Sequence, residues 1–115
     1  MNTALVQAVL NRLALAEVAW APRFVGIEHG DEILSWLPGA PMHDWASAPE
    51  RLDGLTVIVR QLHDLTVGWV PGVECVVHDD LQPRNVVVAP DGQLGLIDWE
   101  QCRGGHRIED RKSVV

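Results

Sequence analysis

Two short apolar runs in the second half of the chain limit the possible folds most strongly. Residues 86–88 and 94–97 flank the segment 89–93, which contains Pro-Asp-Gly. Proline, aspartate and glycine between two such runs favour a turn, so the sequence predicts a β-hairpin. Because a hairpin brings its open ends together, we expect Asn85, which precedes the first run, to lie close to Asp98, which follows the second.

The loop before this hairpin carries the polar side chains that phosphoryl transfer requires. His78, Asp80 and Asn85 stand in the pattern H-x-D-L-x-x-x-N, which resembles the catalytic loop of kinases. Moving a phosphoryl group from ATP to a hydroxyl needs a positioned acceptor and neutralised phosphate charge. We expect Asp80 to be the catalytic residue, which orients the acceptor hydroxyl and takes its proton. Asn85 and Asp98 are the expected metal ligands, because Mg²⁺ prefers oxygen atoms, and His78 is expected to support the loop.

A structural role for these residues is the alternative. An isolated aspartate or asparagine beside a strand is usually a cap or turn residue. The combined order of loop, hairpin and second carboxylate is much harder to obtain by chance, so it favours the catalytic interpretation.

Residues 78–85 and 97–100 resemble the signatures H-G-D-L-x-P-x-N and I-D-W-E of the aminoglycoside phosphotransferase family, which is related to the choline kinases. Asp-Trp-Glu replaces the Asp-Phe-Gly of protein kinases and favours this small-molecule branch. Asp79 and Arg84 depart from the pattern, since both stand where the family commonly has glycine. The resemblance implies ATP or GTP as phosphate donor, Mg²⁺ as cofactor, and the hydroxyl of a small molecule as acceptor.

The resemblance also implies an α+β fold of the protein-kinase-like type, present as a partial chain. Residues 1–37 would form the end of the nucleotide lobe, a helix plus a hairpin, and the hinge. Residues 38–109 would form the start of a mainly helical C-lobe that contains the catalytic hairpin. Residues 110–115 are expected to be a non-native tail, because they resemble a translated sequencing adapter.

The hinge is expected at Ser35, Trp36 and Leu37, whose backbone groups would contact the adenine edge of the nucleotide. The same residues also fit an ordinary hairpin with a buried Trp36. The position of this segment before the catalytic loop favours the hinge.

Hydrophobic spacing and turn residues predict the remaining elements. The first segment has apolar residues at three- and four-residue steps, and a capping-box pattern at 47–50 precedes a second helical stripe. His63, on that second stripe, is expected to pack and to form hydrogen bonds. The expected elements are a helix over 1–19, strands over 24–27 and 32–37, a loop over 40–46, a helix from 47 to about 66 and a buried strand over 75–77.

Composition excludes several classes of protein. A length of 115 residues with 47% hydrophobic residues fits one modest globular domain. A formal charge of -7 argues against a nucleic-acid partner and is compatible with a cationic substrate. Cys75 and Cys102 are too few for a zinc site or a disulfide framework. The first helix is too short and too polar for a membrane span or a signal peptide, so we expect a cytoplasmic protein with no membrane partner.

Two functions remain open. The first is a fragment of an ATP-dependent phosphotransferase that acts on an aminoglycoside, a choline-like molecule or an amino alcohol. The second is a non-catalytic kinase-like remnant. It is suggested because the chain has no G-x-G-x-x-G loop and its only lysine is Lys112, whereas kinases hold the ATP phosphates with a glycine-rich loop and an upstream lysine. In either case exposed apolar surface would favour self-association.

Overall fold

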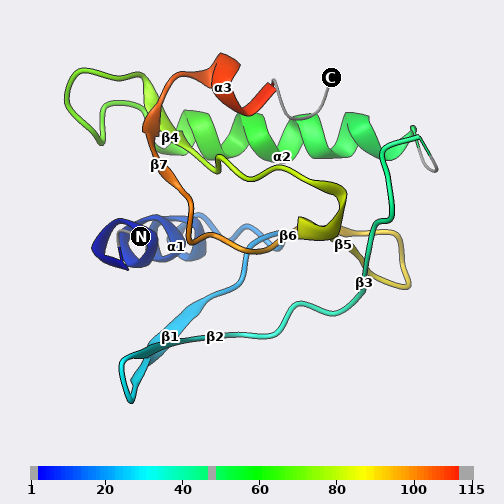
Figure 1. The fold of residues 1–115 in the computed structure, drawn as a ribbon, viewed down its shortest axis with the longest axis horizontal. Coiled ribbons are helices and arrows are strands. Elements are labelled where there is room, and N and C mark those ends of the chain that lie inside the picture. The colour runs from blue at the N-terminus through cyan, green and yellow to red at the C-terminus, as the bar shows by residue number, and fades with distance from the viewer. Residues whose placement is uncertain (1–2, 47–48, 112–115) are drawn as a thin grey trace.

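The computed structural model describes residues 3–46 and 49–111, which form a mixed helix and sheet domain (Figure 1). The expected mixture of helices and strands in one small domain is therefore confirmed. The helices are α1 (Thr3–Leu15), α2 (Arg51–Leu65), the short α3 (Arg107–Arg111) and the single 3-10 turn η1 (Pro83–Asn85).

The strands of the described residues form three small antiparallel sheets. β1 pairs with β2, β4 pairs with β7, and β5 lies between β3 and β6. In Figure 1, α2 lies along one side of the domain and the β1–β2 hairpin projects on the opposite side, with α1 between them. The bounds are β1 (Phe24–Glu28), β2 (Asp31–Leu34), β3 (Ala40–Pro41), β4 (Cys75–Val77), β5 (Val86–Val88), β6 (Leu94–Leu96) and β7 (Arg103–Gly105).

The first helix ends earlier than the predicted range 1–19. It stops at Leu15, and Glu17 then adopts a left-handed conformation with a φ of 59°. The Val18 N–H donates to the Leu13 carbonyl at 3.3 Å, which closes the helix in the manner of a Schellman motif. Glycine usually occupies the left-handed position, so the sequence contains no recognisable stop signal there.

The second helix begins later than the predicted residue 47. It runs over Arg51–Leu65, and its N-cap Glu50 forms no side-chain cap bond. Ser47 and Ala48 of the predicted capping box lie outside the described residues. The predicted apolar stripe is confirmed, since one face of α2 buries Leu55, Ile58, Val59 and Leu62.

The first predicted hairpin is confirmed as β1 and β2. Its turn residues His29 and Gly30 have φ values of 53° and 84°, and a type I′ turn requires positive φ at both positions. The second strand ends at Leu34, before the predicted end at residue 37. Trp36 is 84% exposed, so the alternative of a buried Trp36 is wrong.

The predicted loop over 40–46 is wrong at its start, where β3 pairs with β5. The Met42 N–H extends this contact by donating to the Val86 carbonyl at 3.0 Å. Gly39 permits the close approach, because its φ is 134° and a Cβ there would lie 2.6 Å from the Val88 oxygen. A two-residue strand that contains proline has no alternating pattern, so the local sequence does not predict it.

The core is shared by α1, α2 and the β5–β6 hairpin. Leu13 of α1, Leu62 of α2 and Leu96 of β6 are all 0% exposed. Within the same cluster, Trp20 and Trp99 stack with their ring centroids 6.3 Å apart. Among the described helices, none has the length and hydropathy needed to cross a membrane.

Candidate active site

The loop over 78–85 lies between a buried strand and a buried hairpin. All of β4 is buried, and it leads directly into His78. The predicted β5–β6 hairpin is confirmed, with Val86 opposite Leu96. At its open end the Ile97 N–H donates to the Asn85 carbonyl at 2.9 Å. The structure therefore joins the backbone at Asn85 to the residue that precedes Asp98.

The side chains of Asp80 and Asn85 contact each other directly. The Asn85 Nδ2 donates to the Asp80 Oδ2 at 3.0 Å and to the Asp80 carbonyl at 2.8 Å. The Gln82 amide donates to the other carboxylate oxygen, Oδ1. Because both Asn85 bonds use the amide nitrogen, the amide oxygen is the atom of Asn85 that can bind a cation.

His78 connects the loop to the end of β6. It is 0% exposed, its Nε2 donates to the Ile97 carbonyl at 2.9 Å, and its Nδ1 accepts the Asp80 N–H at 3.3 Å. One ring nitrogen thus donates and the other accepts, as in neutral imidazole. Burial lowers the pKa of His78 from its usual value, which favours the same neutral form.

Asp98 follows β6 in a left-handed conformation, with a φ of 60°. Its neighbour Trp99 is 2% exposed, and the Trp99 indole N–H donates to the Leu96 carbonyl at 2.8 Å. Trp99 also meets the His78 ring edge-on, with centroids 4.9 Å apart. Asp98 itself is exposed. An exposed carboxylate is therefore held on a short segment whose next residue is anchored in the core.

Asp110 is a site residue that the sequence analysis missed, because it was assigned to the expected non-native tail. It lies in α3 at 0% exposure. Its Oδ2 accepts the His63 Nε2–H at 2.6 Å and the His78 N–H at 3.0 Å, and its Oδ1 accepts the Asp79 N–H at 2.9 Å. The expected packing and hydrogen-bonding role of His63 is confirmed. No spacing signal links residues so far apart in the chain.

The expected hinge residues lie in different surroundings. The Ser35 N–H donates to the Arg23 carbonyl at 2.8 Å, while the side chain of Trp36 is largely exposed. Leu37 reaches the β5–β6 hairpin, since a Cβ on Gly95 would lie 3.1 Å from the Leu37 Cδ1. A small pocket of about 50 Å³ borders this contact and is lined by Ala19, Leu37, Pro38, Ala89, Gln93, Leu94 and Gly95.

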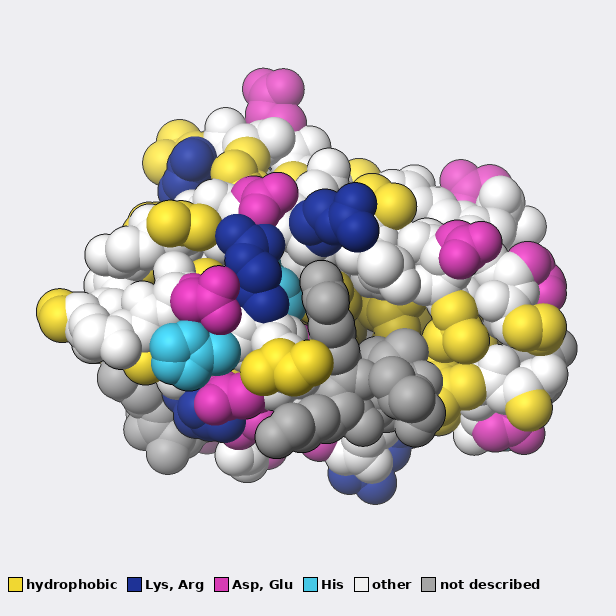
Figure 2. Space-filling model, turned by 90° about the horizontal axis from the view of Figure 1, so that it is seen from above, with side chains coloured by type: hydrophobic (Ala, Val, Ile, Leu, Met, Phe, Trp, Pro, Cys, Tyr) yellow, Lys and Arg dark blue, Asp and Glu magenta, His cyan; other side chains and the backbone are white. Residues whose placement is uncertain are grey.

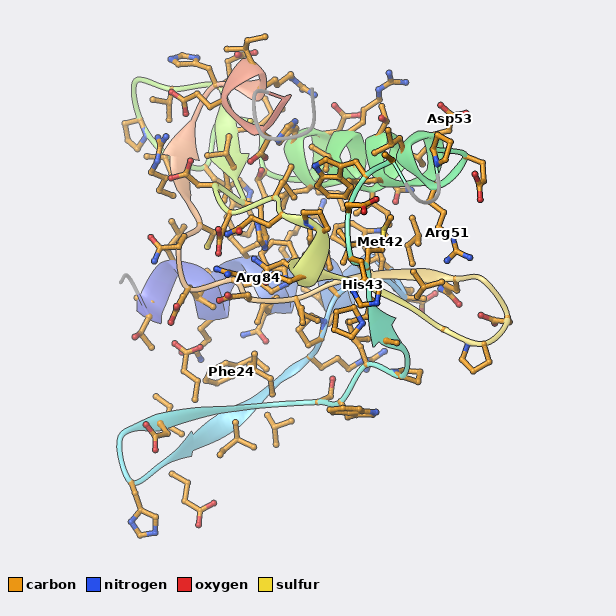
Figure 3. The ribbon with its side chains drawn as sticks, turned by 45° about the vertical axis from the view of Figure 1, so that its right-hand side comes forward. Phe24, Met42, His43, Arg51, Asp53 and Arg84 are labelled. Atoms are coloured by element: carbon orange, nitrogen blue, oxygen red, sulfur yellow. The ribbon has the colours of Figure 1, made fainter. Side chains whose placement is uncertain are left out.

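The surroundings of the loop differ from those of the hinge. In Figure 3, Met42 and His43 lie close together on the segment after β3, and Arg84 lies near the middle of the view. Phe24 lies apart from Met42 and His43, at the start of β1. Arg84, which stands where the family commonly has glycine, is exposed on η1. β3 contacts η1, so the β3 segment borders the loop.

The oxygen atoms of the loop suit a hard cation. No group of three or more His, Cys, Asp or Glu residues among the described residues could hold a metal by itself. The expected ligands, Asn85 and Asp98, would offer one amide oxygen and one carboxylate, which by themselves are an incomplete set for a metal ion. Mg²⁺ is usually bound by one or two protein ligands together with waters and substrate phosphates. An amide oxygen and a carboxylate would therefore suit Mg²⁺ if a nucleotide and waters supplied the remaining ligands.

Comparison with known proteins gives two matches. The model of the "Phosphotransferase enzyme family" matches residues 4–111. The trifolitoxin immunity protein of Rhizobium leguminosarum bv. trifolii is 30% identical over an alignment 114 positions long, which covers 83% of this chain and 44% of that protein. The chain therefore spans less than half the length of this relative.

Proposed function

Because the chain belongs to the phosphotransferase enzyme family, we propose that residues 78–85 and Asp98 form the metal and acceptor side of an ATP-dependent phosphotransferase site. The observation that carries this proposal is the contact of Asn85 with both halves of the site. Its amide nitrogen bonds to Asp80, and its carbonyl bonds to the segment that leads to Asp98.

Each residue of the site has a distinct role in this proposal. Asp80 orients the acceptor hydroxyl and takes its proton, while the amides of Asn85 and Gln82 hold its carboxylate. Asn85 and Asp98 hold Mg²⁺ through oxygen atoms. When bound, the ion neutralises charge on the transferred phosphoryl group. His78, as neutral imidazole, keeps the loop and the end of β6 together.

The protein-kinase-like fold of the family gives the lobe assignment. We place residues 1–37 at the end of the nucleotide lobe and the hinge, and residues 38–109 at the start of the C-lobe. The backbone at Ser35, Trp36 and Leu37 would then contact the base of ATP or GTP. The contact of Leu37 with Gly95 supports this assignment, since it brings the hinge segment to the catalytic hairpin.

The acceptor in this proposal is a small hydroxyl compound that carries positive charge. Aminoglycosides, choline-like molecules and amino alcohols share this chemistry. The formal charge of -7 favours a cationic acceptor over an anionic one.

A non-catalytic kinase-like protein is the second candidate function. The specific observation that favours it is the position of Lys112, the only lysine, after every residue of the proposed site. Kinases pair the ATP phosphates with a lysine upstream of the loop. We therefore expect the 115-residue chain by itself to bind the metal and nucleotide without measurable phosphoryl transfer.

Calorimetric titration with ATP in the presence of Mg²⁺ tests the proposal. Asp98→Asn removes the negative charge of a proposed metal ligand at the open end of the β5–β6 hairpin, and Asp91→Asn makes the same chemical change at the turn end. We expect the Asp98→Asn variant to lose about tenfold or more in affinity, a change of about 1.4 kcal/mol, and the Asp91→Asn variant to match the unaltered chain. Equal affinity in all three proteins, or no binding by the folded unaltered chain, would reject the proposed site.

A further inference from the structure

Asp79 adds a second carboxylate directly before Asp80. Its φ of 66° lies in the left-handed region, which glycine adopts freely and other residues adopt at a cost. The Asp79 N–H donates to the buried Asp110 at 2.9 Å, which fixes the backbone at one point. Because this hydrogen bond fixes the backbone, a partner of the Asp79 side chain must bind it without breaking the bond to Asp110.

Arg103 is that partner. Its Nε lies 2.8 Å from the Asp79 Oδ2, and its Nη2 lies 3.4 Å from the Asp79 Oδ1. The guanidinium thus takes the carboxylate with two nitrogen atoms, an arrangement that fixes orientation as well as charge. Hydrogen bonding to Asp79 raises the pKa of Arg103, so the guanidinium stays protonated.

The position of Arg103 is set before it meets Asp79. Arg103 stands opposite Val77 in the β4–β7 pair, so its side chain starts beside the strand that leads into the loop. Its Nη1 lies 3.0 Å from the Glu109 Oε2 and donates to the Gly104 carbonyl at 3.0 Å. The guanidinium is therefore held by β7 and α3 on one side and receives the Asp79 carboxylate on the other.

The two neighbouring carboxylates consequently have separate partners. Asp80 is bonded to Asn85 and Gln82, and Asp79 is bonded to Arg103. Figure 2 shows basic, acidic and histidine side chains close together on the left of the face seen from above. An unpaired Asp79 would place a second negative charge beside the proposed metal and phosphate site, where it would repel the nucleotide and compete for the cation.

We propose that Arg103 is a positioning residue, which holds the carboxylate of Asp79 away from the metal site and fixes the backbone that directs Asp80 toward Asn85. The effect on nucleotide binding rests on the proposed function, whereas the effect on the backbone does not. The two parts can therefore be tested separately.

Amide hydrogen exchange measured by NMR tests the backbone part in the complete chain. We expect Arg103→Met to raise the exchange rates of the Asp79 and Asp80 amides by about tenfold or more, because local opening no longer breaks the ion pair. Arg107→Met is the matched control, since Arg107 forms an equally short ion pair, 2.8 Å from Asp64. Unchanged exchange at Asp79 and Asp80, or the same increase in both variants, would overturn the proposal.

Titration with Mg²⁺ and ATP tests the charge part, and Asp79→Gly supplies the rescue. We expect Arg103→Met to weaken binding by about fivefold or more. Adding Asp79→Gly to Arg103→Met should recover most of the lost affinity, because glycine adopts the left-handed conformation and the substitution removes the unpaired charge. Arg103→Lys, which keeps the charge, should show a smaller loss and guards against misfolding of the methionine variant.

The outcomes separate the two claims. A double variant that binds no better than Arg103→Met would show that Arg103 only stabilises the fold, and would overturn the charge part. If the unaltered chain binds no nucleotide, the proposed function fails, and hydrogen exchange alone decides whether Arg103 positions the loop.

Discussion

The β1–β2 and β5–β6 hairpins each turn at a glycine with positive φ, Gly30 and Gly92, but end in opposite environments. In the β5–β6 hairpin all of β6 is buried, and β3, Leu37 and the core cover it. In the β1–β2 hairpin, Val25 and Ile27 are 66% and 59% exposed. Local sequence therefore determines that a hairpin forms, and partners elsewhere in the chain determine whether it is buried.

This difference divides the proposed site into a rigid part and an exposed part. The proposed metal and acceptor residues lie at the open end of the buried hairpin, where His78, Trp99 and Asp110 hold the backbone. The proposed hinge follows the exposed hairpin, and few atoms pack against Trp36, which is 84% exposed. We expect substitutions near the buried hairpin to change stability strongly and those near the exposed hairpin to change it little.

Asp110→Ala is expected to have the largest effect, because it removes the carboxylate that receives three N–H groups in the core. The loss in the free energy of unfolding should be about 3–5 kcal/mol, the range for breaking a buried ion pair by removing one partner. Urea unfolding followed by circular dichroism measures it. Asp64→Ala, which removes an exposed partner of Arg107, is the control. A loss of less than about 1 kcal/mol for Asp110→Ala would mean that the loop does not depend on this carboxylate.

Two tryptophans compare the two regions with the same substitution. Trp99→Ala should lower the free energy of unfolding by about 3–5 kcal/mol, since Trp99 is 2% exposed and stacked on Trp20. Trp36→Ala, at 84% exposure, should change it by no more than about 0.5 kcal/mol. Thermal or urea unfolding of both variants provides the measurement. Similar losses at the two positions would remove the distinction between the regions.

The pH dependence of stability tests the neutral state of His78. Since burial lowers the pKa of His78 in the folded chain, the unfolded chain binds a proton first as the pH falls below about 6.5. The contribution of neutral His78 to the free energy of unfolding is therefore complete above that pH. It falls as the pH is lowered toward the folded pKa, by about 1.4 kcal/mol for each unit between the unfolded and folded pKa values. In His78→Gln the stability deficit should be constant above about pH 6.5 and should shrink below it. A deficit that grows on acidification would contradict the neutral imidazole.

Self-association is the smallest expected effect and concerns the exposed hairpin. Ile27→Thr reduces the apolar surface of β1, an unpaired edge of the kind that promotes association. We expect it to weaken self-association in sedimentation experiments while the free energy of unfolding changes by about 0.5 kcal/mol or less. Ile108→Thr, at 55% exposure on α3, is the matched control. Equal effects of the two variants would argue against the hairpin as the associating surface.

The sequence predicted the elements that local patterns encode. The hairpin over 86–97 follows from apolar runs around Pro-Asp-Gly, and the buried face of α2 follows from helical spacing. The proximity of Asn85 to the segment before Asp98 follows from the hairpin alone, and the Ile97 to Asn85 hydrogen bond agrees with it. The roles of Asp80, Asn85 and Asp98 stay predictions.

The features that were not predicted depend on contacts between distant residues. β3 exists because Gly39 lets the chain approach Val88, and the early end of α1 depends on Glu17 in a conformation that its residue type does not indicate. The three hydrogen bonds that Asp110 accepts form because α3 packs against β4. The partner of Asp79 lies 24 residues away, in β7. None of these contacts has a periodic or motif-like signal.

The most direct test of the account is the location of a bound divalent cation. Mn²⁺ accepts the same oxygen ligands as Mg²⁺ and broadens the NMR signals of nearby amides. The account predicts that broadening, at low Mn²⁺ with ATP present, centres on Asn85 and on residues 97–99, and that Asp98→Asn abolishes it. Broadening centred instead on the acidic surface around Asp64 and Glu74, and unchanged by Asp98→Asn, would contradict a metal site at the open end of the β5–β6 hairpin.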